Sequence, residues 1–187
     1  MSEAPGDREI WLIRHAESAW NASGRWQGQA DPALSARGRE QAAALAERVA
    51  TERFDALVSS DLARARATAE TLGRAVGLTP RLDVRLRERD VGTWAGLTRA
   101  EIVARWPDEY ERVQSRDREI RPGGGESIDD VARRARGFFR ELAAERRFAR
   151  VVVVAHGGVI RSLCDVGPIA NAHVVRTSLA AILATER

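Results

Sequence analysis

The chain has 187 residues, of which 44% are hydrophobic and 30% are charged. This length and composition fit one globular domain with a buried core and argue against a disordered or fibrous protein. The formal net charge is only +3. The basic residues, all of them arginine, alternate with acidic ones, so we predict no nucleic-acid partner.

The cysteine content and the lengths of the apolar runs indicate the cellular compartment. The single cysteine, Cys164, excludes an internal disulfide and a multi-cysteine metal site, and it fits a reducing compartment. The most apolar run, 151–155, is far shorter than the roughly 20 residues that a membrane span needs. We therefore expect a cytoplasmic protein that has no membrane partner.

Predicted strands and helices alternate along the chain. Continuous apolar segments predict strands covered on both faces at 10–13, 56–58 and 151–155. Apolar residues at helical spacing predict helices over 42–49, 62–76 and 128–142. This order predicts the α/β class, with a three-layer α/β/α sandwich around a mostly parallel sheet, in one domain that spans residues 1–187.

The segment before the last long helix differs from this pattern. Thr98 and Glu101 have the spacing of a capping box, which predicts a helix start. Residues 97–122 are expected to form one or two short helices outside the sheet, as a small helical cap. The glycines at 123–125 are expected to make a flexible approach to the long helix.

Two of the three histidines follow the ends of predicted strands. His15 comes after the first strand and directly after Arg14, and His156 comes after the last strand. Arg64 lies one turn into the helix that follows the middle strand. Because ligands bind beyond the carboxyl ends of the strands in an open parallel sheet, we expect these side chains to face one site.

Two histidines and two arginines at one sheet edge suit a phosphate. Guanidinium groups bind phosphate oxygens and keep their charge, and a neutral imidazole can attack phosphorus. Metal binding by His15 and His156 is the main rival, but no third ligand lies at ligand spacing, so we predict a site without metal or cofactor. Gly157 allows the backbone to approach an anion.

The leaving oxygen of a phosphomonoester needs a proton, which calls for an acid in the same cleft. Glu88 is the best placed carboxyl group, since it follows an expected short strand and precedes the glycine-flanked Trp94. From the residues alone it remains one acid among many.

Several stretches resemble motifs of the histidine phosphatase superfamily, which includes the phosphoglycerate mutases. They occur in the family's order, at 12–21, 27–38, 60–70, 86–96, 122–127 and 155–161. The resemblance runs from about Glu9 to Arg176 and implies a phosphoglycerate mutase-like fold. Ala16 stands where the signature has glycine, and its effect on the nucleophile's backbone is left open.

The resemblance implies a role for each matching residue. His15 resembles the phosphorylated nucleophile, and Glu88 resembles the proton donor. The contacts with phosphate or substrate that the resemblance implies are Arg14, Asn21, Gln27, Gly28, Arg64, His156 and Gly157. The enzymes of this family need no metal, which agrees with the missing third ligand.

We therefore predict a metal-independent phosphatase that hydrolyses a small phosphorylated metabolite through a phosphohistidine. A phosphoglycerate mutase is the alternative, but such mutases have a larger insertion that shields the site, whereas only 97–122 covers the cleft here. A catalytically inactive phosphate-binding module is a second alternative, against which the full set of catalytic residues argues. The substrate and the oligomeric state stay open, and a homodimer is the commonest arrangement.

Overall fold

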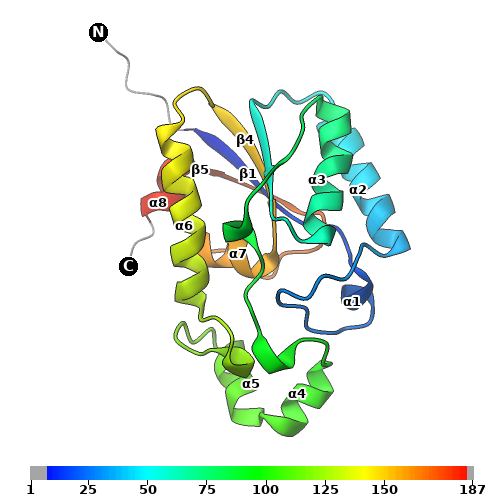
Figure 1. Cartoon of the computed structure of the whole chain (residues 1–187), viewed down its shortest axis with the longest axis vertical. Helices are drawn as coiled ribbons and strands as arrows, with labels where there is room; N and C mark the ends of the chain where they lie inside the picture. Colours follow the sequence, from blue (N-terminus) through cyan, green and yellow to red (C-terminus); the bar gives the residue numbers. More distant parts are fainter. Residues whose placement is uncertain (1–7, 185–187) are drawn as a thin grey trace.

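The computed structural model describes residues 8–184 of the chain. A five-stranded sheet with the strand order β3-β2-β4-β1-β5 forms its centre (Figure 1). The strands are β1 (Glu9–Arg14), β2 (Ala56–Ser59), β3 (Arg81–Leu82), β4 (Arg150–Ala155) and β5 (Val174–Ser178). Neighbouring strands pair in parallel except β1 and β5, which pair antiparallel. The prediction of a mostly parallel sheet is confirmed.

Helices cover both faces of the sheet and give the three predicted layers (Figure 1). The helices packed on it are α2 (Ala36–Val49), α3 (Ala63–Val76), α6 (Ile128–Ala144), α7 (Gly157–Leu163) and α8 (Leu179–Ala184). Successive side chains of a strand point to opposite faces. Trp11 and Ile13 of β1 therefore pack with α2 and α3. Ile10 and Leu12 pack with α6, α7 and α8, which explains why residues 10–13 of β1 are all apolar.

The remaining helices are short and lie outside the layers. They are α1 (Ala19–Ala22), α4 (Arg99–Arg105) and α5 (Pro107–Gln114), with 3₁₀ turns η1 (Val84–Leu86), η2 (Gly92–Trp94) and η3 (Pro122–Gly124). Helix α4 starts at the predicted capping box of Thr98 and Glu101. Helices α4 and α5 lie at the bottom of Figure 1, away from the sheet. Their contacts with the rest of the chain include a cluster of aromatic rings, Trp26, Trp94, Trp106 and Tyr110.

Two parts of the fold differ from the sequence-based expectation. Strand β5 and helix α8 have no predicted counterpart, because Arg176 and its polar neighbours interrupt the apolar pattern on an edge strand that is only half-buried. The short strand expected before Glu88 ends at Leu82, and η1 follows it. Glu88 therefore follows a 3₁₀ turn and not a strand.

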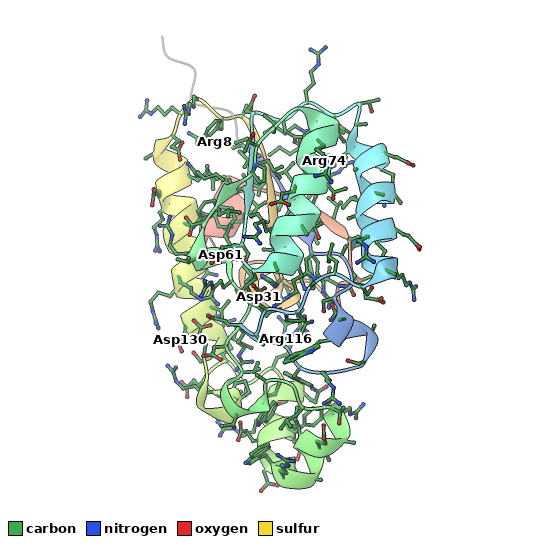
Figure 2. All side chains as sticks on the ribbon, turned by 45° about the vertical axis from the view of Figure 1, so that its right-hand side comes forward. Arg8, Asp31, Asp61, Arg74, Arg116 and Asp130 are labelled. Atoms are coloured by element: carbon green, nitrogen blue, oxygen red, sulfur yellow. The ribbon has the colours of Figure 1, made fainter. Side chains whose placement is uncertain are left out.

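Charged side chains of both signs project from the helices (Figure 2). Many arginines pair with carboxylates, as Arg121 does with Asp130 at 2.6 Å and Arg150 with Glu52 at 2.7 Å. Cys164 is half-buried against the apolar cluster beneath α6. Within residues 8–184, no helix is long and apolar enough to cross a membrane.

The run of three glycines before α6 does not form the flexible approach that the sequence suggests. It lies in and beside η3, which packs against η2. A Cβ atom on Gly123, where φ is +59°, would lie 2.4 Å from the carbonyl oxygen of Val91. A Cβ atom on Gly125 would lie 2.3 Å from that of Asp90. Glycine is required here because two backbones touch, which fixes the end of the cap segment against the loop after Glu88.

Replacing Gly123 by alanine should therefore destabilise the protein. We expect Gly123→Ala to lower the free energy of unfolding by about 2–4 kcal/mol, from the left-handed backbone and the steric overlap together. The matched control is Gly137→Ala in α6, where no atom lies within 4 Å of the added Cβ. That control should stabilise the protein by up to about 1 kcal/mol through helix propensity. Urea unfolding measures both, and equal effects would contradict the packing argument.

Candidate active site

The register of β1 and β4 brings two histidines together. The strands are parallel, and Arg14 at the end of β1 pairs with Ala155 at the end of β4. The next residue of each chain segment is a histidine, and the His15 backbone N–H donates to the carbonyl of Ala155 at 3.0 Å. The ring centroids of His15 and His156 are 5.0 Å apart, and both side chains are buried.

Hydrogen bonding fixes the protonation of the His15 ring. Its Nδ1 lies 2.7 Å from the carbonyl oxygen of Ala16, which can only accept, so Nδ1 carries the proton and Nε2 keeps its lone pair. Burial and the charges of Arg64 and Arg14 hold the pKa of His15 well below its ordinary value of 6.5. The ring is therefore neutral at pH 7, with its lone pair available.

Ala16 fits in place of the signature glycine without backbone strain. Its φ is not in the left-handed region, and its side chain is buried in a small apolar cluster with Leu34 and Ala42. The backbone N–H of Ala16 donates to Thr68 Oγ1 at 3.1 Å. The added methyl group therefore packs away from the His15 ring and leaves the loop hydrogen-bonded.

His156 is held by a side chain that follows β2. Its Nε2 forms a hydrogen bond with Ser60 Oγ at 2.9 Å, and Ser60 follows the end of β2. Burial, together with the charges of Arg64 and His15, keeps the pKa of His156 well below its ordinary value. Its Nδ1 is buried and has no partner within residues 8–184.

Two arginines are fixed beside the histidines by backbone carbonyls. Arg64 is fully buried, and its two terminal nitrogens donate to the carbonyls of Ala30 and Gly28, both at 2.8 Å. Arg14 donates to the carbonyl of Ile169. The Nε atoms of both arginines are buried without a partner in the described part of the chain. Buried cations of this kind form a binding site for an anion.

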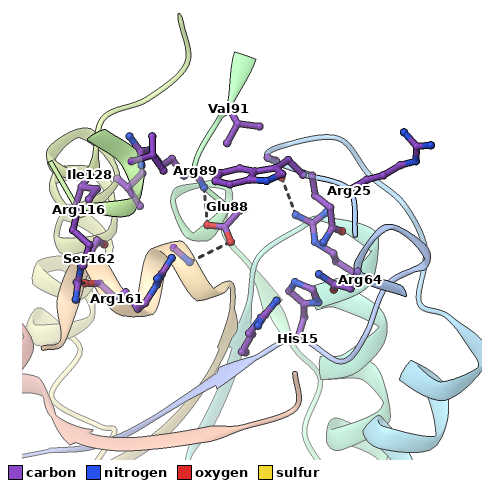
Figure 3. Close-up of a pocket in the computed structure, with 18 of the residues that line it drawn as sticks. His15, Arg25, Arg64, Glu88, Arg89, Val91, Arg116, Ile128, Arg161 and Ser162 are labelled. Carbon is purple, nitrogen blue, oxygen red and sulfur yellow. Dashed lines mark hydrogen bonds between the residues drawn. The ribbon is translucent and has the colours of Figure 1, made fainter. Parts of the chain in front are cut away.

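A cavity of about 360 Å³ opens in front of these groups (Figure 3). Seven of the nine predicted site residues line it: Arg14, His15, Asn21, Gln27, Gly28, Arg64 and Glu88. The other two are next to lining residues. His156 contacts His15, and a Cβ atom on Gly157 would lie 3.5 Å from Arg14 Nε.

Two amide side chains are oriented by protein contacts to their oxygens. Asn21 Oδ1 accepts from the Ser18 N–H and from Asn171 Nδ2, both at 3.2 Å, and Gln27 Oε1 accepts from Ser18 Oγ at 2.6 Å. Within residues 8–184, neither amide nitrogen donates to a protein acceptor. Both amides line the cavity, so their N–H groups are donors for the oxygens of a bound anion.

Glu88 lies across the cavity from His15 and is held by two backbone N–H groups (Figure 3). Arg89 N donates to Oε1 at 2.8 Å, and Gly158 N donates to Oε2 at 3.2 Å. A Cβ atom on residue 158 would lie 2.2 Å from Oε1. Only glycine allows α7 to approach this carboxyl group so closely.

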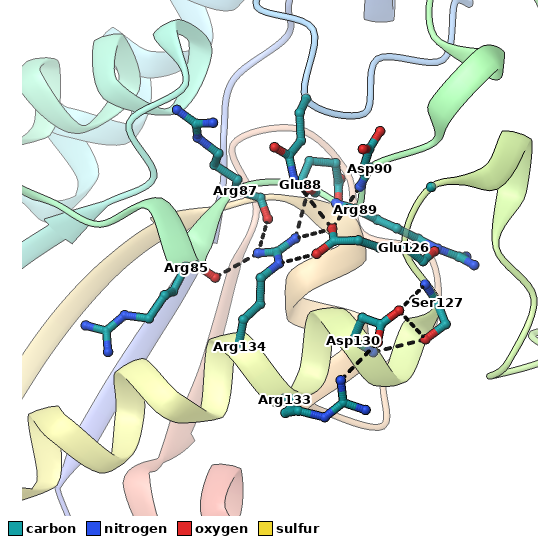
Figure 4. A network of polar contacts seen from close by, with 12 residues as sticks. Arg85, Arg87, Glu88, Arg89, Asp90, Glu126, Ser127, Asp130, Arg133 and Arg134 are labelled. Atoms are coloured by element: carbon teal, nitrogen blue, oxygen red, sulfur yellow. Dashed lines mark hydrogen bonds and ion pairs between the residues drawn. The ribbon is translucent and has the colours of Figure 1, made fainter.

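A partly buried network of hydrogen bonds supports the loop that carries Glu88 (Figure 4). Arg134 of α6 donates to the backbone carbonyls of Arg85, Arg87 and Glu88 at 2.6–2.9 Å. The same guanidinium forms two hydrogen bonds with the Glu126 carboxylate, both at 2.8 Å. Five donor contacts from one side chain fix the position of this loop relative to the sheet.

Sequence reasoning missed several residues of this site. Two of them could have been found from the sequence, because Ser60 follows a predicted strand and Glu126 belongs to a stretch that resembles a family motif. Arg134 and Asn171 could not, because their partners lie 8 to 156 residues away in the chain. His173, the third histidine, is exposed.

The site thus contains two neutral imidazoles, two fixed cations, oriented amide donors and one carboxyl group. Within residues 8–184, no group of three or more His, Cys, Asp or Glu side chains could hold a metal ion. This set of side chains defines a phosphate-binding site with a nitrogen nucleophile and an acid, at the carboxyl ends of a parallel sheet.

Comparison with known proteins identifies the family. Residues 10–180 match the histidine phosphatase superfamily (branch 1), and the chain belongs to it. Phosphoserine phosphatase 1 of Hydrogenobacter thermophilus is 37% identical over 83% of this chain and 74% of that protein. Glucosyl-3-phosphoglycerate phosphatase of Mycobacterium tuberculosis is 42% identical over 83% of this chain and 73% of that protein.

The solved structures give the same picture. A mycobacterial glucosyl-3-phosphoglycerate phosphatase in complex with VO3 superposes with a TM-score of 0.83 at 39% identity, over 90% of this chain and 92% of that one. The family, the fold class and the phosphatase class predicted from the sequence are confirmed by these matches.

The two buried neutral imidazoles should make stability depend on pH. A histidine with a lowered folded-state pKa binds its proton only in the unfolded state, so stability is lost as the pH falls below about 6.5. As the pH falls from 6.5 to 5, the slope that His15 and His156 each contribute should rise from about half of its limit towards that limit, about 1.4 kcal/mol per pH unit. Denaturant unfolding at several pH values measures this slope.

Each of the variants His15→Asn and His156→Asn should remove about half of this histidine-dependent slope. The control is His173→Gln, which replaces the exposed histidine and should leave the slope as in the wild type. A wild-type stability that is flat across this pH range would contradict the assignment of neutral rings.

Proposed function

We propose that the chain hydrolyses phosphomonoesters of small metabolites through a phosphohistidine on His15. The observation that carries this proposal is the state of the His15 ring. Its Nδ1 is bonded to the carbonyl of Ala16, so its Nε2 lone pair faces a cavity that Arg14 and Arg64 also line. A neutral nitrogen nucleophile between fixed cations is suited to attack a phosphoryl dianion.

The proposed reaction has two steps. In the first, Nε2 of His15 bonds to phosphorus, the ester P–O bond breaks, and Glu88 gives its proton to the leaving oxygen. In the second, the Glu88 carboxylate takes a proton from water, whose oxygen bonds to phosphorus as the P–N bond to His15 breaks, so inorganic phosphate leaves and Nε2 regains its lone pair. Arg14, Arg64 and His156 bind the equatorial oxygens, with Asn21 and Gln27 as further donors. Gly28 contributes by holding Arg64 through its carbonyl.

The names of the relatives and the small size of the cap support a phosphatase over the alternative, a phosphoglycerate mutase. Relatives that are 37–42% identical over 83% of this chain carry phosphatase names. Within residues 8–184, the cap is the short segment 97–122, with α4 and α5, which contributes Val113 and Arg116 to the cavity lining. A small cap admits water to the phosphohistidine. We propose that 1–187 acts as one domain with this cap, works in the cytoplasm, and needs neither metal nor nucleic acid.

Hydrolysis of p-nitrophenyl phosphate tests this function. The wild type should release phosphate in the presence of EDTA, because no step uses a metal. His15→Ala should lower kcat by more than about 1,000-fold, since the variant has no nucleophile. Trapping of a ³²P-labelled protein by an alkaline quench, in which the P–N bond of phosphohistidine is stable, checks the intermediate, and the label should be absent in His15→Ala. Turnover that survives in His15→Ala would remove the assignment.

The role of Glu88 as the acid predicts a dependence on the leaving group. Glu88→Gln should slow an alkyl phosphate at least about 100-fold, because an alkoxide is a poor leaving group without a proton. The same variant should slow p-nitrophenyl phosphate far less, because nitrophenolate leaves readily. Equal losses on the two substrates would contradict the acid role.

Arg134 acts in this proposal as a positioning residue for Glu88. Arg134→Gln should reproduce part of the same selective loss, about tenfold on the alkyl phosphate, because the backbone of residues 85–88 loses its donor contacts. The neighbouring Arg133 projects from α6 to Asp130, so Arg133→Gln is the matched control. A loss in Arg134→Gln that is equal on both substrates would show a merely structural role.

A further inference from the structure

The cavity carries more positive charge than one phosphoryl group requires. Its lining includes one carboxyl group, that of Glu88, and six arginines: Arg14, Arg25, Arg64, Arg89, Arg116 and Arg161. Arg14 and Arg64 beside His15 already match the charge of a phosphomonoester dianion. The other four arginines therefore call for a separate explanation.

All four side chains donate hydrogen bonds to backbone carbonyls, but they differ in the number of their contacts. Within residues 8–184, those of Arg25 and Arg89 each have two polar contacts with the protein, whereas those of Arg116 and Arg161 each have one, at 3.1 and 3.4 Å. Arg25 and Arg89 donate to backbone carbonyls, and Arg25 also lies 3.8 Å from the carboxylate of Glu101. Arg116 and Arg161 form no ion pair with any carboxylate of residues 8–184. They lie together, since Arg116 Nη2 donates to the carbonyl of Arg161 at 3.1 Å.

The pair lies at a distinct end of the cavity. Figure 3 shows Arg116 and Arg161 at the end opposite His15 and Arg64, with Glu88 between the two ends. The lining also includes the apolar side chains Val91, Val113 and Ile128. The volume of about 360 Å³ falls in the range of small-molecule sites and exceeds what a phosphoryl group alone would need.

Arg116 occupies a backbone position that favours glycine. It follows the end of α5, and its φ is +59°. The N–H of Asp117 donates to the carbonyl of Arg112 at 3.0 Å, and the N–H of Arg116 donates to that of Val113 at 3.2 Å. This pair of bonds is the Schellman helix end, where glycine is common because a Cβ atom is penalised. A strained arginine in the lining of a cavity indicates a role for its side chain.

We propose that Arg116 and Arg161 bind a second anionic group of the substrate, a carboxylate or a second phosphate. This inference rests on the proposed function, because the first anion is the phosphoryl group at His15. The substrate is then a small phosphomonoester with a negative charge at both ends and a short carbon skeleton against the apolar wall. Arg116 comes from the cap segment and Arg161 from α7, so the cap takes part in substrate selection.

Matched substrate pairs test the inference. The carboxylate arm compares 3-phosphoglycerate with glycerol 3-phosphate, which has a hydroxymethyl group in place of the carboxylate. The phosphate arm compares fructose 1,6-bisphosphate with fructose 6-phosphate. We expect the wild type to favour the doubly anionic member by about tenfold or more in kcat/KM in one arm, and that arm identifies the second group.

Variants then test the two arginines. Arg116→Gly and Arg161→Gln should each lower the preference in that arm by about tenfold, mainly through KM, since a group remote from the reacting bond contributes binding. Arg116→Gly relieves the left-handed strain, so its melting temperature should stay the same or rise. This keeps the loss of preference separate from a loss of folding. Arg105→Gln, an exposed α4 arginine outside the lining, is the matched control and should keep the preference.

The outcomes separate the two proposals. If the wild type fails to hydrolyse p-nitrophenyl phosphate, the proposed function fails. If it hydrolyses that substrate but shows equal kcat/KM within each pair, the second anion site is overturned and the phosphatase stands. A preference that Arg116→Gly and Arg161→Gln leave unchanged would overturn the assignment to these residues.

Discussion

The parallel pairing of β1 with β4 is the constraint on which the site depends. Because Arg14 pairs with Ala155, the residue after each strand is a histidine, and the two rings meet at 5.0 Å. A slip of one residue in this register would turn every side chain of β1 to the other face. The apolar residues on both faces of the strands oppose such a slip, so the core that stabilises the sheet also sets the distance between the imidazoles.

The charged side chains around the histidines are positioned mainly by hydrogen bonds with backbone groups, and less by oppositely charged side chains. Arg64 is bound by two carbonyls, and Glu88 accepts from two backbone N–H groups. Arg134 in turn binds three carbonyls of the loop that leads to Glu88. These contacts leave the Arg64 charge uncompensated at the cavity and fix its direction before an anion binds. Preorganised donors of this kind stabilise a transition state without reorganisation.

The residues at the strand ends were predicted well from the sequence. Continuous apolar runs mark the strands, and in a parallel sheet the ligand binds beyond the carboxyl ends of the strands. Glu88 was predicted only through a motif, since no local pattern distinguishes that carboxyl group from its neighbours. The hydrogen bonds of Asn171 to the loop around His15 could not be predicted from the sequence, because partners some 150 residues apart leave no periodic signal. The glycines before α6 were misjudged as flexible because a sequence shows a glycine's freedom and not the backbone that packs against it.

Several residues around the cavity are chosen for reasons other than the local preference of the backbone. Gly28 and Gly158 satisfy steric demands that other residues create, whereas Arg116 does the opposite and keeps a side chain where its backbone favours glycine. Stability alone would favour glycine at position 116, since the Schellman turn is complete without a side chain. Residues that violate local preference are expected where function sets the choice. The cap therefore contributes more than a cover for the phosphohistidine, since its one left-handed arginine lines the end of the cavity that the phosphoryl group does not need.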